Sequence, residues 1–390
     1  MTHPRVDIPE GFRAFPTAVS RASTTLFPNV AALREAETQS DPLWSYGLNR
    51  TPTQMELAQR LAQMEGGAHC LLLPSGLSAI SLTLFACLKA GDEILAPDNA
   101  YGPLRAHANW LARDYGLQVR YYDPMLGAGV GALISPQTKL IWIETPGSVT
   151  MELPDVPAIA AAARARGILT AMDHTWTGGL LIRPFELGVD ISIQALTKYQ
   201  SGASDVLMGS VVTRDAALHA RLLKTRKLLG LGVSSDDCYF ILRSLPTLAA
   251  RLRAHEERAL ALAQWLRERP EVYRVLHPAF PECPGHVNWL RDYSGASSLF
   301  SAVFHQRFGQ SRIDAFIDDL RLFGIGYSWG GAHSLALPYD IPAMRSAASW
   351  PPADWPARED AGILVRFYCG LEDAPDLIED VRQSMARHLV

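Results

Sequence analysis

The residues ILTAMD (168–173) and ISIQAL (191–196) form two short apolar runs, and each leads into residues that can carry chemistry. The first run ends in Asp173, and the second is followed by Thr197 and Lys198. Five similar runs lie at about residues 70–73, 93–96, 119–122, 140–143 and 207–213, with helical patterns between most of them. Strands that alternate with helices favour βαβ units, so we expect an α/β fold with a mostly parallel, seven-stranded sheet.

The chain of 390 residues is long enough for more than one domain. Residues 1–50 are irregular and contain several prolines, which suggests an arm that contacts a neighbouring subunit. Residues 51–243 contain the alternating pattern and form the expected α/β domain. A long helix over about 248–268 and strands near 298–304 and 363–368 predict a smaller α+β domain over 244–390.

The composition excludes several classes of protein. Hydrophobic residues make up 48% of the chain, which excludes a mainly disordered protein, and a net charge of −4 leaves no overall basic footprint for nucleic acid. No apolar stretch approaches the roughly 20 residues that span a bilayer, and the N-terminus lacks a secretory pattern. Five widely spaced cysteines predict free thiols, with neither disulfides nor a metal site. We therefore expect a cytoplasmic protein without a membrane partner, and the low charged fraction, 19%, hints at surface buried between subunits.

Three constellations point to one cofactor. The turn PSGL (74–77) between a strand and a helix can direct backbone N–H groups at an anion, although it can also be a plain turn. Asp173 and Lys198 each end an apolar run, where ligands bind in open α/β sheets, although an isolated Asp or Lys there is more often a cap or a solvated residue. Together they match what pyridoxal 5′-phosphate (PLP) needs, namely an anion nest, an acid for the pyridine nitrogen and an amine for the aldehyde.

The sequence resembles the Cys/Met-metabolism group of PLP-dependent enzymes of fold type I. The similar stretches are YGLNRTPT (46–53), PSGL (74–77), NAYGP (99–103), ETPGS (144–148), DHTW (173–176), QALTKY (194–199), YSWGG (327–331) and GLED (370–373). The resemblance covers nearly the whole chain from about Ser20. It implies a PLP-binding α/β domain, a smaller C-terminal domain, and a homotetramer built as a dimer of dimers.

The resemblance also implies a role for each matching residue. Lys198 is expected to bind the cofactor aldehyde and to carry the α-proton, Asp173 to pair with the pyridine nitrogen, and Tyr101 to stack on the ring. The phosphate is expected at the turn of Ser75, Gly76 and Leu77, with the hydroxyl of Thr197. Arg366 is expected to bind the substrate α-carboxylate, with Ser328 and Trp329 beside the substrate. Tyr46 is expected to reach the cofactor, the substrate and the chemistry of a neighbouring subunit.

Two positions depart from the pattern of the family. Many relatives have an arginine that clamps the phosphate two residues after the equivalent of Tyr46, whereas this chain has Leu48 there and Arg50 nearby. Either Arg50 takes over the contact or the phosphate has one cationic partner fewer. Relatives usually have asparagine after the aspartate, where this chain has His174, which we interpret as a hydrogen-bonding residue behind the site.

The activity implied by the resemblance is a carbon–sulfur β-lyase. Its expected substrate is L-cystathionine or a related L-cysteine thioether, cleaved to a thiol (homocysteine from cystathionine), pyruvate and ammonia. The alternatives within the family are γ-elimination, γ-replacement and cysteine desulfhydration, and the sequence leaves them open.

Two other motifs suggest unrelated functions. GYSWG (326–330) matches the nucleophile elbow of a serine hydrolase, with Ser328 as the nucleophile and Asp340 and His388 after it. That motif requires a strand before it and a helix after it, and Gly330 and Gly331 are poor helix formers. GAGVGA (127–132) matches a dinucleotide fingerprint, but residues 124–126 separate it from the preceding strand. Both remain remote hypotheses.

Overall fold

The computed structural model describes residues 10–11, 14–38, 45–346 and 350–390. The expectation that the N-terminal residues are not a secretory signal therefore falls mainly outside the described part. Within that part, no helix is both long and apolar enough to cross a membrane.

The larger sheet has seven strands in the order β1-β7-β6-β5-β4-β2-β3. Its strands are β1 (His69–Leu73), β2 (Glu93–Pro97), β3 (Gln118–Tyr122), β4 (Thr138–Glu144), β5 (Leu169–Asp173), β6 (Ile191–Ala195) and β7 (Gly209–Thr213). The strands β6, β5, β4, β2 and β3 pair in parallel, and β7 is antiparallel to both of its neighbours. The expected seven-stranded, mostly parallel sheet is confirmed, with β7 as its reversed strand.

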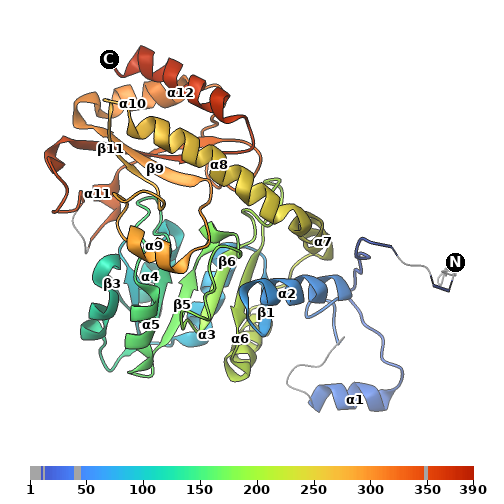
Figure 1. The fold of residues 1–390 in the computed structure, drawn as a ribbon. Coiled ribbons are helices and arrows are strands. Elements are labelled where there is room, and N and C mark those ends of the chain that lie inside the picture. The colour runs from blue at the N-terminus through green and yellow to red at the C-terminus, as the bar shows by residue number, and fades with distance from the viewer. Residues whose placement is uncertain (1–9, 12–13, 39–44, 347–349) are drawn as a thin grey trace.

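Helices cover both faces of this sheet because the side chains of each strand alternate between the faces. In β4, Leu140 and Trp142 join one apolar cluster while Ile141 and Ile143 join another. The first cluster packs α3 (Gly76–Cys87), α4 (Gly102–Tyr115) and α6 (Ala216–Leu228), and the second packs α5 (Val156–Arg164) and the short 3₁₀ region η1 (Pro124–Leu133). Figure 1 shows the layers, with α2 (Pro52–Glu65) and α7 (Ser235–Ser244) beside β1.

The C-terminal part is built on a second, antiparallel sheet with the order β10-β11-β9-β8. Its strands are β8 (Val272–Leu276), β9 (Leu299–His305), β10 (Leu335–Tyr339) and β11 (Ala361–Tyr368). The helices α8 (Leu248–Arg267), α10 (Gly309–Asp318) and α12 (Ala374–His388) bury an aromatic-rich cluster against it, and the short helices α9 (His286–Asp292) and α11 (Ile341–Met344) lie toward the larger sheet. The expected α+β arrangement is therefore present.

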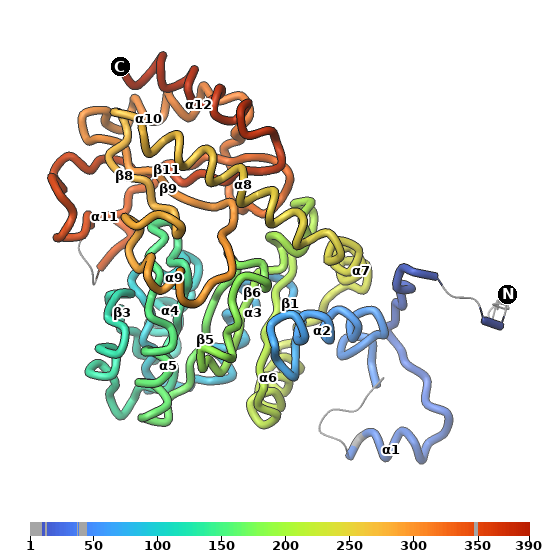
Figure 2. The backbone as a smooth tube through the Cα atoms, in the orientation of Figure 1, coloured from blue at the N-terminus to red at the C-terminus, as the bar shows by residue number. Residues whose placement is uncertain are grey.

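Residues 14–38 extend away from the rest of the described chain. Figure 2 shows this arm, which carries the isolated helix α1 (Val30–Thr38), beyond α2. Its contacts with the rest of the chain include a hydrogen bond from the Thr17 hydroxyl to Glu56 (2.6 Å) and one from the Ser20 amide to the Thr53 hydroxyl (2.9 Å). An isolated antiparallel β-bridge also pairs Thr24 with Tyr46.

Candidate active site

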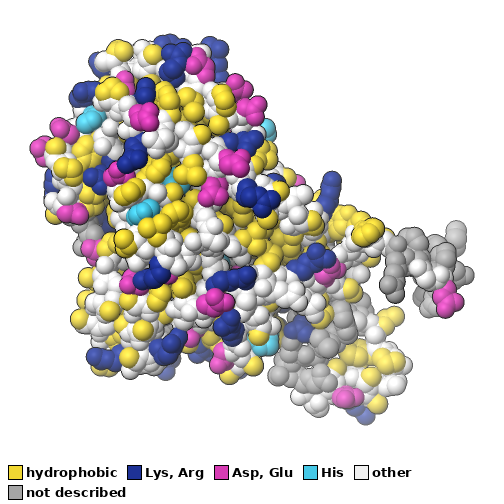
Figure 3. Space-filling view, in the orientation of Figure 1, with side chains coloured by type: hydrophobic (Ala, Val, Ile, Leu, Met, Phe, Trp, Pro, Cys, Tyr) yellow, Lys and Arg dark blue, Asp and Glu magenta, His cyan; other side chains and the backbone are white. Residues whose placement is uncertain are grey.

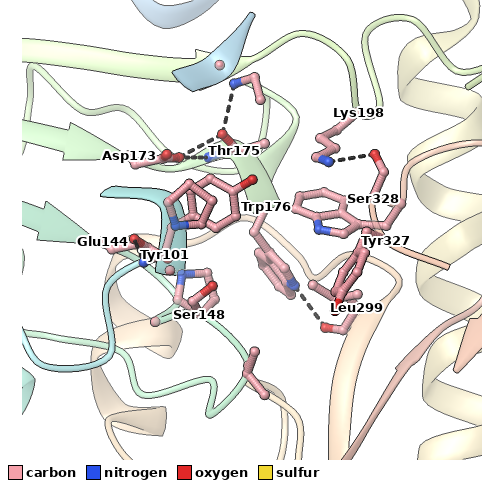
Figure 4. Close-up of a pocket in the computed structure, with 18 of the residues that line it drawn as sticks. Tyr101, Glu144, Ser148, Asp173, Thr175, Trp176, Lys198, Leu299, Tyr327 and Ser328 are labelled. Carbon is pink, nitrogen blue, oxygen red and sulfur yellow. Dashed lines mark hydrogen bonds between the residues drawn. The ribbon is translucent and has the colours of Figure 1, made fainter. Parts of the chain in front are cut away.

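A cavity of about 630 Å³ lies between the carboxyl ends of the parallel strands and the C-terminal sheet. This is where open α/β sheets bind ligands. Its lining includes ten of the residues expected from the sequence, namely Ser75, Gly76, Leu77, Tyr101, Asp173, Thr197, Lys198, Ser328, Trp329 and Arg366. Figure 4 shows that Asp173 and Lys198 enter it from opposite sides of the view, with Tyr101 and Tyr327 nearby.

Asp173 ends β5, and two donors fix its carboxylate. The backbone N–H and the hydroxyl of Thr175 both donate to Oδ1, at 3.0 and 2.7 Å. Burial raises the pKa of Asp173, whereas these bonds and the nearby His174 and Lys198 charges act in the opposite direction. The carboxylate is therefore held in place with one oxygen, Oδ2, to which no donor among the described residues is bonded.

Glu144 is a second buried carboxyl beside Asp173, because the two residues are paired across β4 and β5. It accepts a hydrogen bond from the backbone N–H of Tyr101 (2.7 Å) and further ones from Ser148. Burial and the Asp173 charge raise the pKa of Glu144 well above its usual range. Glu144 therefore places a second acidic group, whose charged form is disfavoured, directly beside Asp173, and it anchors the loop that carries Tyr101.

Lys198 lies opposite, just beyond β6. Its Nζ donates to Oγ of Ser328 at 2.6 Å and lies 5.2 Å from the centre of the Trp329 ring. Burial and the positive charge of Arg366 lower the pKa of Lys198 to about 8, although Asp173 partly opposes them. A neutral amine is the nucleophile that a carbonyl requires, so this environment prepares Lys198 for that role.

The N-terminus of α3 forms a backbone cradle next to Lys198. Ser75 caps the helix, with its hydroxyl accepting from the Ser78 N–H at 3.0 Å. A Cβ on Gly76 would stand 2.6 Å from Cβ of Ala195, so only glycine permits this close approach of the helix to β6. The amides of the first helical turn have no partners within the helix, and they suit an anion such as a phosphate.

Arg366, on β11, reaches the cavity from the C-terminal sheet. It is 7% exposed, and its Nε has no hydrogen-bond partner among the described residues. Its contacts are weak, namely one terminal nitrogen 3.5 Å from the carbonyl of Ser328 and the guanidinium 5.5 Å from the centre of the Tyr339 ring. Burial lowers the pKa of Arg366, but an arginine stays charged. A buried guanidinium with unused donors fits a carboxylate from a ligand.

These observations test whether the residues fit PLP. The cavity offers a backbone cradle for a phosphate, a carboxylate with an unbonded oxygen, a partly neutralised amine and an aromatic ring on Tyr101, which is 42% exposed. Thr197 differs in detail, because its hydroxyl is bonded to the backbone of Met208, accepting from N–H at 3.0 Å. The donor set fits the cofactor.

Two expected site residues lie outside this cavity. Tyr46 is 49% exposed on the arm, and Arg50 lines a smaller cavity with Arg226. Neither therefore reaches the cavity of its own chain in this structure. An arm that extends away from its own cavity is compatible with a contact to a neighbouring subunit. That contact stays a prediction.

The interpretation of His174 matches its surroundings, because its ring is fully buried and does not line the cavity. It faces Glu65, Ser192 and Thr177. Three further buried residues, Glu144, Thr175 and Glu65, have no role that was expected from the sequence. Glu144 could have been found as a site residue, because it ends an apolar run as Asp173 does. Glu65 could not, because it ends a helix and nothing in the sequence links it to His174.

The structure does not form the two competing motifs. Ser328 lies in an irregular segment with φ +74°, and no strand leads into it and no helix follows within residues 326–334. Asp340 caps α11 and His388 lies 3.2 Å from Asp319, so neither assists Ser328. Residues 127–132 lie within η1, not at a strand-to-helix turn. The serine hydrolase and dinucleotide hypotheses are therefore wrong.

Comparisons with known proteins agree with this geometry. Residues 3–386 match the model of the family described as Cys/Met metabolism PLP-dependent enzyme. The chain is 42% identical to a putative cystathionine β-lyase of Rhizobium johnstonii over 94% of this chain and 90% of the relative. It is 37% identical to cystathionine β-lyase MetC of Escherichia coli over 95% and 93%. A solved structure of cystathionine γ-synthase from Xanthomonas oryzae superposes with a TM-score of 0.85 at 31% identity, covering 98% of this chain and 95% of that one. The chain therefore belongs to the family of Cys/Met metabolism PLP-dependent enzymes, and its cofactor is pyridoxal 5′-phosphate.

Proposed function

We propose that this protein is a PLP-dependent carbon–sulfur β-lyase that cleaves L-cystathionine or a related L-cysteine thioether. The observation that carries the proposal is the placement of Lys198 and Arg366 in one cavity, in a chain similar over most of its length to cystathionine β-lyases. A proton-carrying amine and a carboxylate receptor are the two groups that elimination from an amino acid requires.

Each group of the site has a separate task in this reaction. Bound PLP supplies an aldehyde for the substrate amine and a ring that withdraws electrons from Cα. Arg366 binds the substrate α-carboxylate through its free donors, which fixes Cα relative to Lys198. Lys198 then takes the proton from Cα, and the electron pair of the broken Cα–H bond forms a Cα=Cβ double bond while the pair of the Cβ–S bond leaves with sulfur.

Lys198 also completes the proton balance. A thiolate that leaves needs a proton, and Lys198 returns the one that it has just taken. With cystathionine, homocysteine leaves, and the remaining three-carbon unit reacts with water to give pyruvate and ammonia. A pKa of about 8 suits both directions of transfer, because the amine gains and loses a proton near neutral pH.

The decisive experiment is incubation of the yellow holoenzyme with L-cystathionine, followed by identification of the keto acid. Pyruvate supports the β-lyase. 2-Oxobutyrate would show γ-elimination instead. Release of neither acid would contradict cystathionine as the substrate. Lys198→Ala should lose both the visible absorbance and the activity, whereas Lys224→Ala, at an exposed lysine of α6, should retain them.

We also propose a homotetramer in which the arm completes the site of a neighbour. The arm places Tyr46 and Arg50 outside the cavity of their own chain, and the described surface exposes several large apolar side chains. Leu207 (70% exposed), Leu228 (78%) and Phe240 (45%) are three of them. Figure 3 shows apolar surface around α7, next to the arm. Sedimentation of a stable, active monomer would contradict this assembly.

We propose an arm over 1–50, a cofactor domain over 51–243 and a C-terminal domain over 244–390, for which the two separate sheets give support. The boundary at 243 falls in the last turn of α7, and the short 3₁₀ turn η3 (Leu245–Thr247) separates this helix from the long helix α8. We propose a cytoplasmic location, supported by five cysteines that are all free thiols.

A further inference from the structure

A buried polar cluster lies behind Asp173, outside the cavity. It consists of Glu65 at the end of α2, His174 and Thr177 after β5, and Ser192 and Gln194 on β6. Each of these side chains is at most 1% exposed. The mechanism above uses none of them, so the presence of an acid and an imidazole there needs its own explanation.

The Nδ1 side of the His174 ring faces Thr177. The Thr177 hydroxyl donates to the backbone carbonyl of His174 at 2.9 Å and accepts from the Gly179 N–H at 3.3 Å. Its distance to Nδ1 is 2.8 Å. A hydroxyl has one proton to donate, so with that proton on the carbonyl, Nδ1 must be a donor.

The Nε2 side faces Ser192 and Glu65. Nε2 lies 2.6 Å from Oγ of Ser192 and 3.3 Å from Oε2 of Glu65. The Ser192 hydroxyl donates to the same Oε2, so it can only accept from Nε2. Glu65 is thus an acceptor at both oxygens, since Oε1 receives the amide N–H of Gln194 at 2.7 Å. This pattern suits a carboxylate beside an imidazole that is protonated on both nitrogens.

Charge balance favours the same state. If the Thr177 hydroxyl turned to Nδ1, His174 would be neutral and Glu65 would be a buried carboxylate without a cation. Such a charge is strongly disfavoured in a protein interior. Cys70 also lies near Glu65, and burial raises the pKa of that thiol well above its usual range, so it stays neutral. Arg183 and Arg214 donate to the backbone carbonyls of Met64 and Gly66, on either side of Glu65, and not to its carboxylate. Among the described residues, His174 is the only ion-pair partner found for Glu65.

We propose that His174 is an imidazolium paired with Glu65, and that it is a positioning residue whose charge keeps Asp173 ionised to receive the cofactor. The inference rests on the proposed role of Asp173. The groups around the Asp173 carboxylate have opposing effects on its pKa. Burial raises the pKa of Asp173 and the Glu144 carboxyl lies beside it, while Thr175, His174 and Lys198 favour the charged form. His174 adds a positive charge from behind the sheet, where it does not obstruct the cavity.

The first test reads the protons directly in the apoenzyme labelled with ¹⁵N-histidine. At pH 7.5, wild-type protein should show two downfield ring N–H signals that disappear together in His174→Asn. Glu65→Gln removes the anion and should leave one of them. Ser192→Ala is the matched control, because it removes a hydrogen bond of the same cluster without changing a charge, and it should retain both. A single ring N–H for His174 in the wild type overturns the proposal.

The second test asks whether the charge acts on Asp173. The Kd of the apoenzyme for PLP is measured at pH 5.5 and at pH 8 for the wild type and each variant. The Kd at pH 5.5 divided by the Kd at pH 8 is then compared between the proteins, because this ratio cancels effects of a mutation that do not depend on pH. Loss of the cation raises the pKa of Asp173, so less carboxylate is present at pH 5.5 and PLP binds more weakly there. The ratio of the Kd at pH 5.5 to the Kd at pH 8 should therefore be roughly twofold larger in His174→Asn and Glu65→Gln than in the wild type, a small effect because Glu65 offsets much of the charge.

Ser192→Ala should keep the wild-type ratio. Equal ratios in all four proteins would refute the positioning role, even with both ring protons present. Circular dichroism at both pH values verifies that each variant is folded. Failure of the proposed function would differ from both outcomes, since the wild-type holoenzyme would then release no pyruvate from L-cystathionine while the ring protons and the Kd ratios stayed as expected.

Discussion

Nζ of Lys198 lies 2.6 Å from Oγ of Ser328, although 130 residues separate the two in the chain. The lysine lies just after β6 of the larger sheet, and the serine belongs to the irregular segment before β10 of the C-terminal sheet. The backbone around the serine must come very close to make this contact, because a Cβ on Gly330 would stand 2.5 Å from the carbonyl carbon of Lys198. The site therefore exists only where the two sheets meet.

The reaction of Lys198 with PLP should depend on pH through its lowered pKa. With a pKa of about 8, roughly one amine in ten is neutral at pH 7, against a few in ten thousand for an ordinary lysine. The rate at which apoenzyme regains visible absorbance with PLP should therefore rise with pH and level off above about pH 8. Arg366→Gln removes a charge that lowers the pKa of Lys198, so its curve should move to higher pH. Superimposable curves would contradict this electrostatic link.

Arg366 should control substrate binding. Arg366→Ala should lower kcat/KM for L-cystathionine roughly 100-fold, because hydrogen bonds to a charged group are worth about 1.5–3 kcal/mol each. Arg366→Lys keeps the charge but loses the planar fork, and it should recover only part of the activity. Visible absorbance should stay unchanged in both variants. Full activity in Arg366→Ala would place the carboxylate receptor elsewhere.

Gly76 and Gly102 provide a matched pair of glycines at the starts of helices. A Cβ on Gly76 would meet Ala195 at 2.6 Å, whereas a Cβ on Gly102 meets nothing within 4 Å. Gly76→Ala should therefore destabilise the cradle by about 1–3 kcal/mol and weaken PLP binding. Gly102→Ala should leave both unchanged. Thermal melting and PLP titration of the two apoproteins measure these effects.

Ser328 should assist catalysis without being essential. Ser328→Ala removes the acceptor of the Lys198 hydrogen bond, and the activity should fall roughly tenfold, in line with about 1.5 kcal/mol for a bond to a charged group. The variant should still bind PLP and stay yellow. Complete loss of activity with intact absorbance would show that Ser328 does more than orient the lysine.

Much of the cofactor side of the cavity could be predicted from sequence. Asp173 and Lys198 end apolar runs, and strand ends in a parallel sheet meet at one edge. The arginine could be assigned only through resemblance, because nothing local in β11 marks Arg366 as different from a solvated arginine. Glu65 could not be predicted, since its partner His174 lies 109 residues away and the contact depends on how α2 packs beside β5 and β6.

The sequence by itself determined the α/β alternation, the cradle at Ser75 and Gly76, and the strand-end positions of the acid and the amine. These features depend on local periodicity, capping and turn chemistry, which a short segment carries within itself. Only the tertiary structure decided that Arg366 and Ser328 face Lys198, that Glu144 shares a buried site with Asp173, and that a buried acid stands behind His174. Those relationships arise from packing between distant segments, and the same packing removes the water that would otherwise keep the pKa values of Lys198 and Glu144 in their ordinary ranges.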